Sequence, residues 1–148
     1  MKHGSKRESE VPASRVRQFF ALAVGIAFVA AGILGVVPWA TTGASELSAA
    51  GPHSETYLFG IFAVSILHNV LHLAFGVAGI VLAMRAIGAR IYLVGGGIAY
   101  LALTVYGLVI DLDSEANVIP PNQADNWLHL GVGLALVVLG LVPLRGPR

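Results

Sequence analysis

Four long stretches of this sequence are almost free of ionisable side chains, and they constrain the fold more than any other feature. They are Gln18–Val37, Tyr57–Met84, Ile91–Ile110 and Asn126–Leu144. Apart from tyrosine, their only ionisable side chains are His68, His72 and His129. A helix of about 20 mostly apolar residues spans the hydrocarbon core of a bilayer. The sequence therefore predicts an all-α integral membrane four-helix bundle, with helices at about residues 18–37, 57–84, 91–110 and 123–144.

The overall composition also favours lipid as the solvent of this chain. Charged residues make up only 11% of the 148 residues, whereas soluble domains carry about 25%. The net charge is +1 and nothing in the charge pattern indicates nucleic acid as a partner. The absence of cysteine from the sequence excludes disulfides, thiol catalysis and cysteine-ligated metals.

The charged residues between the stretches predict how the chain crosses the membrane. All 9 basic residues fall in the two terminal tails or in the second loop: Lys2, Lys6, Arg7, Arg15, Arg17, Arg85, Arg90, Arg145 and Arg148. In the first and third loops, all charged residues are acids, among them Glu46 and Asp111, and there is no Lys or Arg. Basic loops stay on the cytoplasmic side. We therefore expect a multi-pass protein of the cell membrane with cytoplasmic tails at 1–17 and 145–148 and a single transmembrane domain at 18–144.

Two pairs of stretches resemble each other. Five residues match at equal spacing: Asn69, Leu71, His72, Leu73 and Gly76 correspond to Asn126, Leu128, His129, Leu130 and Gly133. Similarly, Gly25-Ile26-Ala27-Phe28 corresponds to Gly97-Ile98-Ala99-Tyr100, and Gly35 to Gly107. These matches predict two helical hairpins with the same orientation, related by an axis along the membrane normal.

The rare polar residues of the second and fourth helices form two matched pairs. His68 and His72 are four residues apart and share one helix face, as do Asp125 and His129. Because polar groups are costly in lipid, we expect them to face the bundle interior in the outer half of the bilayer. We also expect helices two and four to pack together along these faces.

Three interpretations of these polar residues are open. In the first they form a structural network with Ser65, Asn69, Asn122 and Asn126, in which Asn122 caps the fourth helix and Asp125 is the acid of its first turn. In the second His68, His72, Asp125 and His129 bind a divalent metal ion, or two of the histidines bind haem. In the third the histidines form a proton or small-solute path that continues through Tyr100, Thr104 and Tyr106.

Two motifs resemble a bacterial, mostly actinobacterial, membrane protein family named domain of unknown function 4383. The first runs from Leu58-Phe59-Gly60-Ile61-Phe62 to His68-Asn69-Val70-Leu71-His72-Leu73, and the second is Asn122-Gln123-Ala124-Asp125-Asn126-Trp127-Leu128-His129-Leu130. Ser65 stands where the family often has Asn. The resemblance covers about Arg15 to Leu144 and implies four membrane helices, but no activity, substrate or cofactor.

The leading functional prediction is a non-enzymatic membrane protein, a structural or accessory subunit of a larger membrane complex or a homo-oligomer. The alternative predictions are a metal- or haem-binding membrane protein and a proton or small-solute path.

Overall fold

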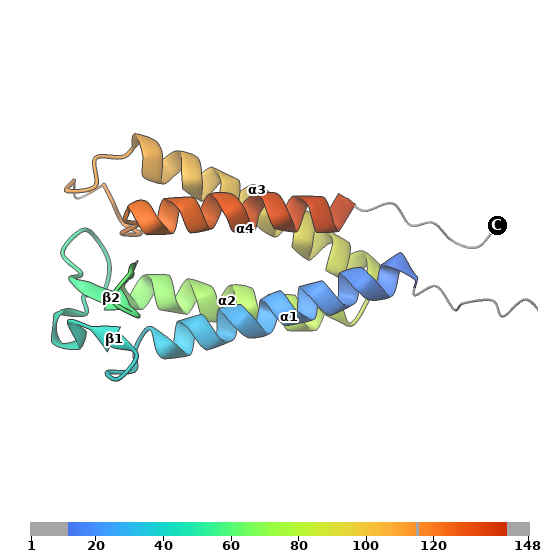
Figure 1. Cartoon of the computed structure of the whole chain (residues 1–148), viewed down its shortest axis with the longest axis horizontal. Helices are drawn as coiled ribbons and strands as arrows, with labels where there is room; N and C mark the ends of the chain where they lie inside the picture. The colour runs from blue at the N-terminus through green and yellow to red at the C-terminus, as the bar shows by residue number, and fades with distance from the viewer. Residues whose placement is uncertain (1–11, 115, 142–148) are drawn as a thin grey trace, which may run out of the picture.

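Four long helices make up most of the chain. The computed structural model describes residues 12–114 and 116–141, in which the helices are α1 (Ala13–Leu34), α2 (Ile66–Ala83), α3 (Ala86–Val109) and α4 (Gln123–Leu141) (Figure 1). Each helix is long and apolar enough to cross a membrane. The predicted four-helix membrane bundle is therefore confirmed. The tails 1–11 and 142–148 lie outside the described residues.

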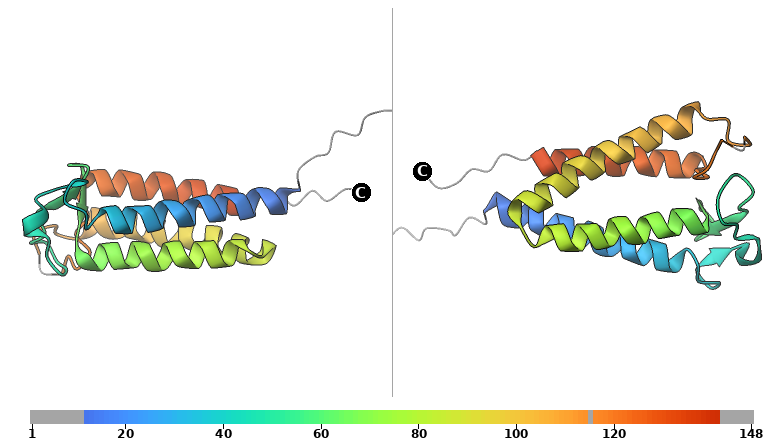
Figure 2. Two further views of the ribbon diagram at one scale, coloured as in Figure 1. Left: turned by 90° about the horizontal axis from the view of Figure 1, so that it is seen from below. Right: turned by 180° about the vertical axis from the view of Figure 1, so that it is seen from behind.

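The helices are arranged as two hairpins. The closest helix pairs are α1 with α2 and α3 with α4, and the two hairpins diverge toward one end of the bundle (Figure 2). Glycines bring the helices of each hairpin together. A Cβ on Gly25 would lie 2.8 Å from the carbonyl oxygen of Gly76, and a Cβ on Gly97 would lie 2.8 Å from that of Gly133. Such close backbone contact is typical of membrane helices with small residues at the interface.

An asparagine repeats the same contact in both hairpins. Asn69 of α2 lies against Gly35, directly after α1, and Asn126 of α4 lies against Gly107 of α3. Both contacts are so close that a Cβ on either glycine would collide with the amide group. The residues matched in the sequence therefore make matched contacts, as two copies of one hairpin would.

The second helix is shorter than predicted. It begins at Ile66, and the preceding residues form the strands β2 (Thr56–Leu58) and β3 (Phe62–Val64). Phe59 and Gly60 between the strands have positive φ angles of 53° and 70°, which a helix does not allow. The prediction of a helix from residue 57 was wrong because this hairpin is as apolar as a membrane helix. α1 and α3 begin at Ala13 and Ala86, earlier than the predicted 18 and 91.

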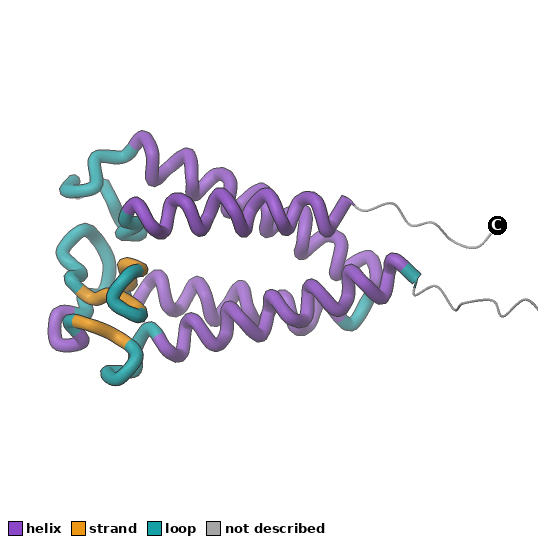
Figure 3. The backbone as a smooth tube through the Cα atoms, in the orientation of Figure 1, coloured by secondary structure: helices purple, strands orange, loops and turns teal. Residues whose placement is uncertain are grey.

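A small sheet covers one end of the first hairpin. β1 (Thr41–Thr42), the one-turn helix η1 (Ala44–Glu46), β2 and β3 follow one another, and the antiparallel strand order is β1-β2-β3 (Figure 3). Ala40, Leu58 and Val64 form the small apolar core beneath it. The sheet lies at the end of the bundle opposite the start of α1 and the end of α4 (Figure 1).

The charges of the described residues are separated along the bundle. Arg15 and Arg17 lie in the first turns of α1, and Arg85 and Arg90 lie where α2 is connected to α3, at the same end (Figure 1). The described acids of the first and third loops, Glu46, Glu55, Asp111 and Asp113, belong to the end that carries the sheet. The end that faces the cytoplasm stays a prediction from the charge pattern.

Candidate functional site

Asp125 and Asn122 form a reciprocal cap at the start of α4. The backbone N–H of Asn122 donates to Oδ2 of Asp125 at 2.9 Å, and the backbone N–H of Asp125 donates to Oδ1 of Asn122 at 2.9 Å. The predicted roles of Asn122 as the helix cap and Asp125 as the acid of the first turn are confirmed. Such a pair satisfies amide groups that a helix start leaves without partners.

The same cap connects the two hairpins. The backbone N–H of Ala63 in β3 donates to Oδ2 of Asp125 at 3.0 Å, and the side-chain amide of Asn122 donates to the carbonyl oxygen of Ile61 at 2.6 Å. Asp125 is only 2% exposed. We call Asp125, Asn122 and the backbone of residues 61–63 the polar lock. The β3 side of the polar lock could not be predicted from the sequence, because residues 61–63 lie within a stretch that the sequence predicts to be helical.

The other polar residues act within their own hairpins. Ser65 caps α2, because its hydroxyl oxygen accepts the backbone N–H of His68 at 3.1 Å. The side-chain amide of Asn126 donates to the carbonyl oxygen of Gly107 at 3.0 Å. Asn69 packs against Gly35 at the matching position, but its side-chain amide has no hydrogen-bond partner among the described residues. Ser65, Asn69 and Asn126 thus each hold a local contact.

Helices α2 and α4 do not pack along their polar faces, so that prediction was wrong. Their closest helix partners are α1 and α3. The two polar faces meet only through side chains, where the rings of His68 and His129 lie 6.3 Å apart between centroids. His68 and His72 are closer, at 4.4 Å. The spacing of His68 and His72 predicted the direction of the side chains but not the distance between the helices.

The ring contacts between the hairpins follow a matched arrangement that involves Phe28, His72, Tyr100 and His129. Phe28 of α1 lies 5.5 Å from His72, and its counterpart Tyr100 of α3 lies 5.1 Å from His129. Phe28 and Tyr100 are 5.2 Å apart across the axis. The duplication thus pairs His72 with His129 and Phe28 with Tyr100, and His68 lies beside His72. We call His68, His72, Tyr100 and His129 the histidine cluster.

The three histidines, like Arg17, Asn69, Tyr92 and Asn126, have buried side-chain polar atoms without a hydrogen-bond partner among the described residues. His68 is 5% exposed and His129 is 3% exposed. The Nδ1 atoms of His68, His72 and His129 are buried and have no hydrogen-bond partner among the described residues. Buried polar atoms without partners are uncommon in native proteins and call for an explanation, such as a bound water, ion or ligand.

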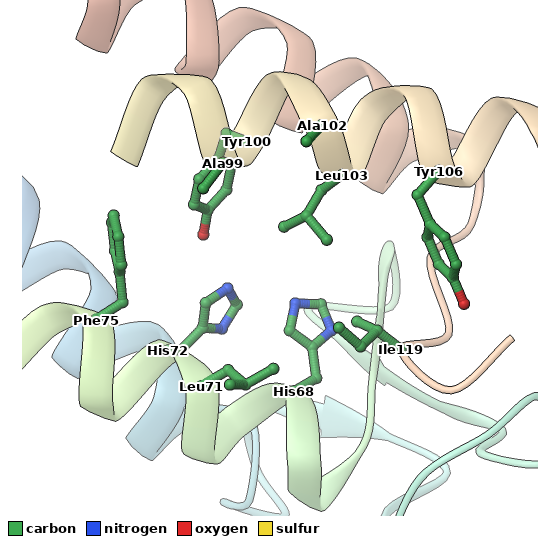
Figure 4. Close-up of a pocket in the computed structure, with 10 residues that line it drawn as sticks. All are labelled: His68, Leu71, His72, Phe75, Ala99, Tyr100, Ala102, Leu103, Tyr106 and Ile119. Atoms are coloured by element: carbon green, nitrogen blue, oxygen red, sulfur yellow. The ribbon is translucent and has the colours of Figure 1, made fainter. Parts of the chain in front are cut away.

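A cavity of about 520 Å³ lies beside the histidine cluster, between α2 and α3. His68 and His72 enter it from α2, and Tyr100 directs its hydroxyl group toward His72 from α3 (Figure 4). The rest of its wall is almost entirely apolar and includes Phe75 and Leu103. We call this cavity the first chamber. Its volume falls within the range of about 300–1,000 Å³ typical of small-molecule sites.

The four residues predicted to bind metal lie near one another without forming a coordination sphere. Within residues 12–114 and 116–141, no group of three or more His, Cys, Asp or Glu side chains is arranged to hold a metal ion. Oδ2 of Asp125 already accepts two amide protons.

Thr104 and Tyr106, the other residues of the predicted path, hold backbone groups. Thr104 donates to the carbonyl oxygen of Tyr100 at 3.0 Å, and Tyr106 donates to that of Ala116 at 2.9 Å. Both hydroxyl groups therefore have local structural contacts.

The four long apolar helices define the class of this chain as a multi-pass membrane protein. Residues 18–142 match the family described as domain of unknown function (DUF4383), and the chain belongs to that family. No curated protein and no solved structure matches this chain.

Proposed function

We propose that this protein is a non-enzymatic membrane protein that binds a small lipophilic molecule in the first chamber. The observation that carries the proposal is the chamber itself, a largely apolar cavity of about 520 Å³ whose wall includes two imidazoles and two phenols. Sites for small molecules commonly combine apolar walls with a few polar groups that orient the ligand. The polar lock supports this arrangement by joining the hairpins at the end where they diverge.

The surroundings of the chamber favour a ligand that is dissolved in the bilayer. Leu71 lines the chamber and is 44% exposed, so the wall continues onto the outer surface of α2. In a membrane that surface faces hydrocarbon. A lipophilic molecule would therefore reach the chamber from the side, between α2 and α3, without crossing water.

The polar groups favour a ligand with a carbonyl group. Tyr100 supplies a hydroxyl donor, and a neutral imidazole supplies one N–H donor. Both groups would hydrogen-bond to a carbonyl oxygen that enters an otherwise apolar space. A naphthoquinone with one isoprenoid unit, whose flat ring would lie beside Phe75, is a suitable probe.

Replacement of His72 by phenylalanine should weaken binding of this naphthoquinone by about tenfold or more. The phenylalanine ring at position 72 can still pack on Phe28, but the ligand carbonyl loses a hydrogen-bond donor. This loss costs about 1–3 kcal/mol in a buried site. The dissociation constants of the wild-type protein and the variant in lipid nanodiscs test this. Leu71→Met changes the same wall without a polar group and should alter the affinity less than about threefold. Equal affinities for His72→Phe and the wild type would contradict the proposed role of His72.

The metal- or haem-binding alternative retains one specific observation in its favour. Three imidazoles share one cluster, with 4.4 Å and 6.3 Å between the ring centroids of His68 and its two neighbours. Metal analysis and a visible absorption spectrum of protein purified from its native membrane test it. A stoichiometric divalent metal or a haem Soret band that disappears in His129→Ala would establish this alternative, and the absence of both would end it.

The proposed orientation places the sheet outside the cell and the α2–α3 connection in the cytoplasm. Because the sequence has no cysteine, single cysteines report the side directly. Ser45→Cys in η1 should react with a membrane-impermeant maleimide added to intact cells, whereas Ala86→Cys should react only after lysis. The reverse labelling would contradict the orientation. Association with an envelope complex or with further copies stays a prediction from the sequence.

A further inference from the structure

A second cavity, of about 310 Å³, lies on the other side of the histidine cluster. It is enclosed by α1, α4 and the sheet, and it shares His68, His72 and Tyr100 with the first chamber. We call it the second chamber. His129 also lines it, is 3% exposed, and has an Nδ1 atom without a partner in the described part of the chain.

The walls of the two chambers correspond through the internal repeat. His68, Leu71 and His72 of α2 line the first chamber, and their counterparts Asp125, Leu128 and His129 of α4 line the second. A cavity from chance packing defects would have no reason to use the same positions in both hairpins. The duplication therefore explains why equivalent positions of the two hairpins line the two chambers.

The helices opposite these residues show the same correspondence. Ala99 and Tyr100 of α3 line the first chamber, and their counterparts Ala27 and Phe28 of α1 line the second. The second chamber differs in one further respect, because the sheet residues Leu58 and Val64 cover it. It is thus a smaller and more enclosed version of the same site.

We propose that the second chamber is a separate binding site for a lipophilic molecule with a hydroxyl group; this rests on the proposed function only in assuming that the first chamber also takes a ligand. The repeat places a carboxylate, Asp125, at the position of His68. In the polar lock, Oδ2 of this carboxylate accepts hydrogen bonds from the backbone N–H groups of Ala63 and Asn122. Its other oxygen, Oδ1, takes no part in these two bonds. A carboxylate oxygen accepts a hydrogen bond, so it selects a ligand that donates one.

The equivalent alanines Ala27 and Ala99 provide a matched pair of variants. Phenylalanine at position 27 would fill the second chamber, and phenylalanine at position 99 would fill the first. Binding of farnesol, a prenyl alcohol, and of the isoprenoid naphthoquinone is measured for each variant in nanodiscs. Ala27→Phe should weaken farnesol binding at least tenfold and change naphthoquinone binding less than threefold. Ala99→Phe should have the opposite effect.

The outcomes separate this proposal from the proposed function. Unchanged farnesol binding in Ala27→Phe, or loss of both ligands in Ala99→Phe alone, would overturn the second site. Farnesol binding that depends on position 27, together with no naphthoquinone binding in the wild type, would support the second site and contradict the proposed ligand of the first. If Ala27→Phe does not fold, Ala31→Leu fills the same chamber with the residue that the second repeat carries at Leu103. The same reduction of farnesol binding is expected for it, and its absence would overturn the proposal.

Discussion

Replacement of Gly97 by leucine should destabilise the second hairpin by about 3 kcal/mol or more, the upper part of the range for overpacked sites. A Cβ at this position would lie 2.8 Å from both the carbonyl oxygen of Gly133 and the backbone nitrogen of Val137. Because both atoms belong to the backbone of α4, no rotation of a side chain can make room for it. The helices would have to separate along their whole crossing.

Gly95 provides the control for this prediction. It lies two positions earlier in α3, and a Cβ there would meet no atom within 4 Å. Gly95→Leu should therefore change stability by less than about 1 kcal/mol, because leucine is a good helix former. Thermal unfolding of both variants in detergent, followed by circular dichroism, measures the difference. Equal midpoints for Gly97→Leu and Gly95→Leu would show that the glycine crossing does not hold α3 against α4.

The number of helices and their pairing could be predicted because both depend on patterns within the sequence. Apolar length identifies a membrane helix, and the repeated glycines and asparagines identified the hairpins. The same positions, Gly25 and Gly97, make the close crossings in the structure. The start of α2 could not be predicted from hydropathy, since the strands before it are equally apolar. Gly60 in the turn between the strands and Ser65 at the N-cap were the local signs of this break.

The candidate site was predictable in its residues but not in its shape. The spacing of His68, His72 and His129 singled them out, and the cap formed by Asn122 and Asp125 followed from local helix chemistry. The two chambers could not be foreseen, because empty space between helices leaves no pattern in a sequence. The expectation that α2 packs on α4 was wrong for a related reason, since the distance between two helices also leaves no pattern in a sequence. A polar helix face shows a direction, whereas the distance to the next helix depends on the glycine contacts of each hairpin.

Removal of the Asp125 carboxylate is the second change with a large expected effect. Asp125→Ala should lower the free energy of unfolding by about 3 kcal/mol, because the buried amide of Ala63 and the half-buried amide of Asn122 both lose their acceptor. Asp125→Asn keeps an acceptor oxygen and should cost about 1 kcal/mol. Asp113→Ala, which removes an exposed acid in the third loop, should change little.

Hydrogen exchange distinguishes loss of the polar lock from loss of a helix cap alone. Without Asp125, the amide of Ala63 in β3 has no acceptor in α4, so exchange at residues 59–64 should become at least about tenfold faster, the factor that corresponds to 1.4 kcal/mol. If only the α4 cap matters, faster exchange will be confined to residues 122–126, and β3 will stay as protected as in the wild type. That result would mean that other contacts join the hairpins, such as the hydrogen bond from Asn122 to Ile61 and the apolar cluster around Tyr92. It would also predict that Asp125→Ala leaves the first chamber intact and able to bind.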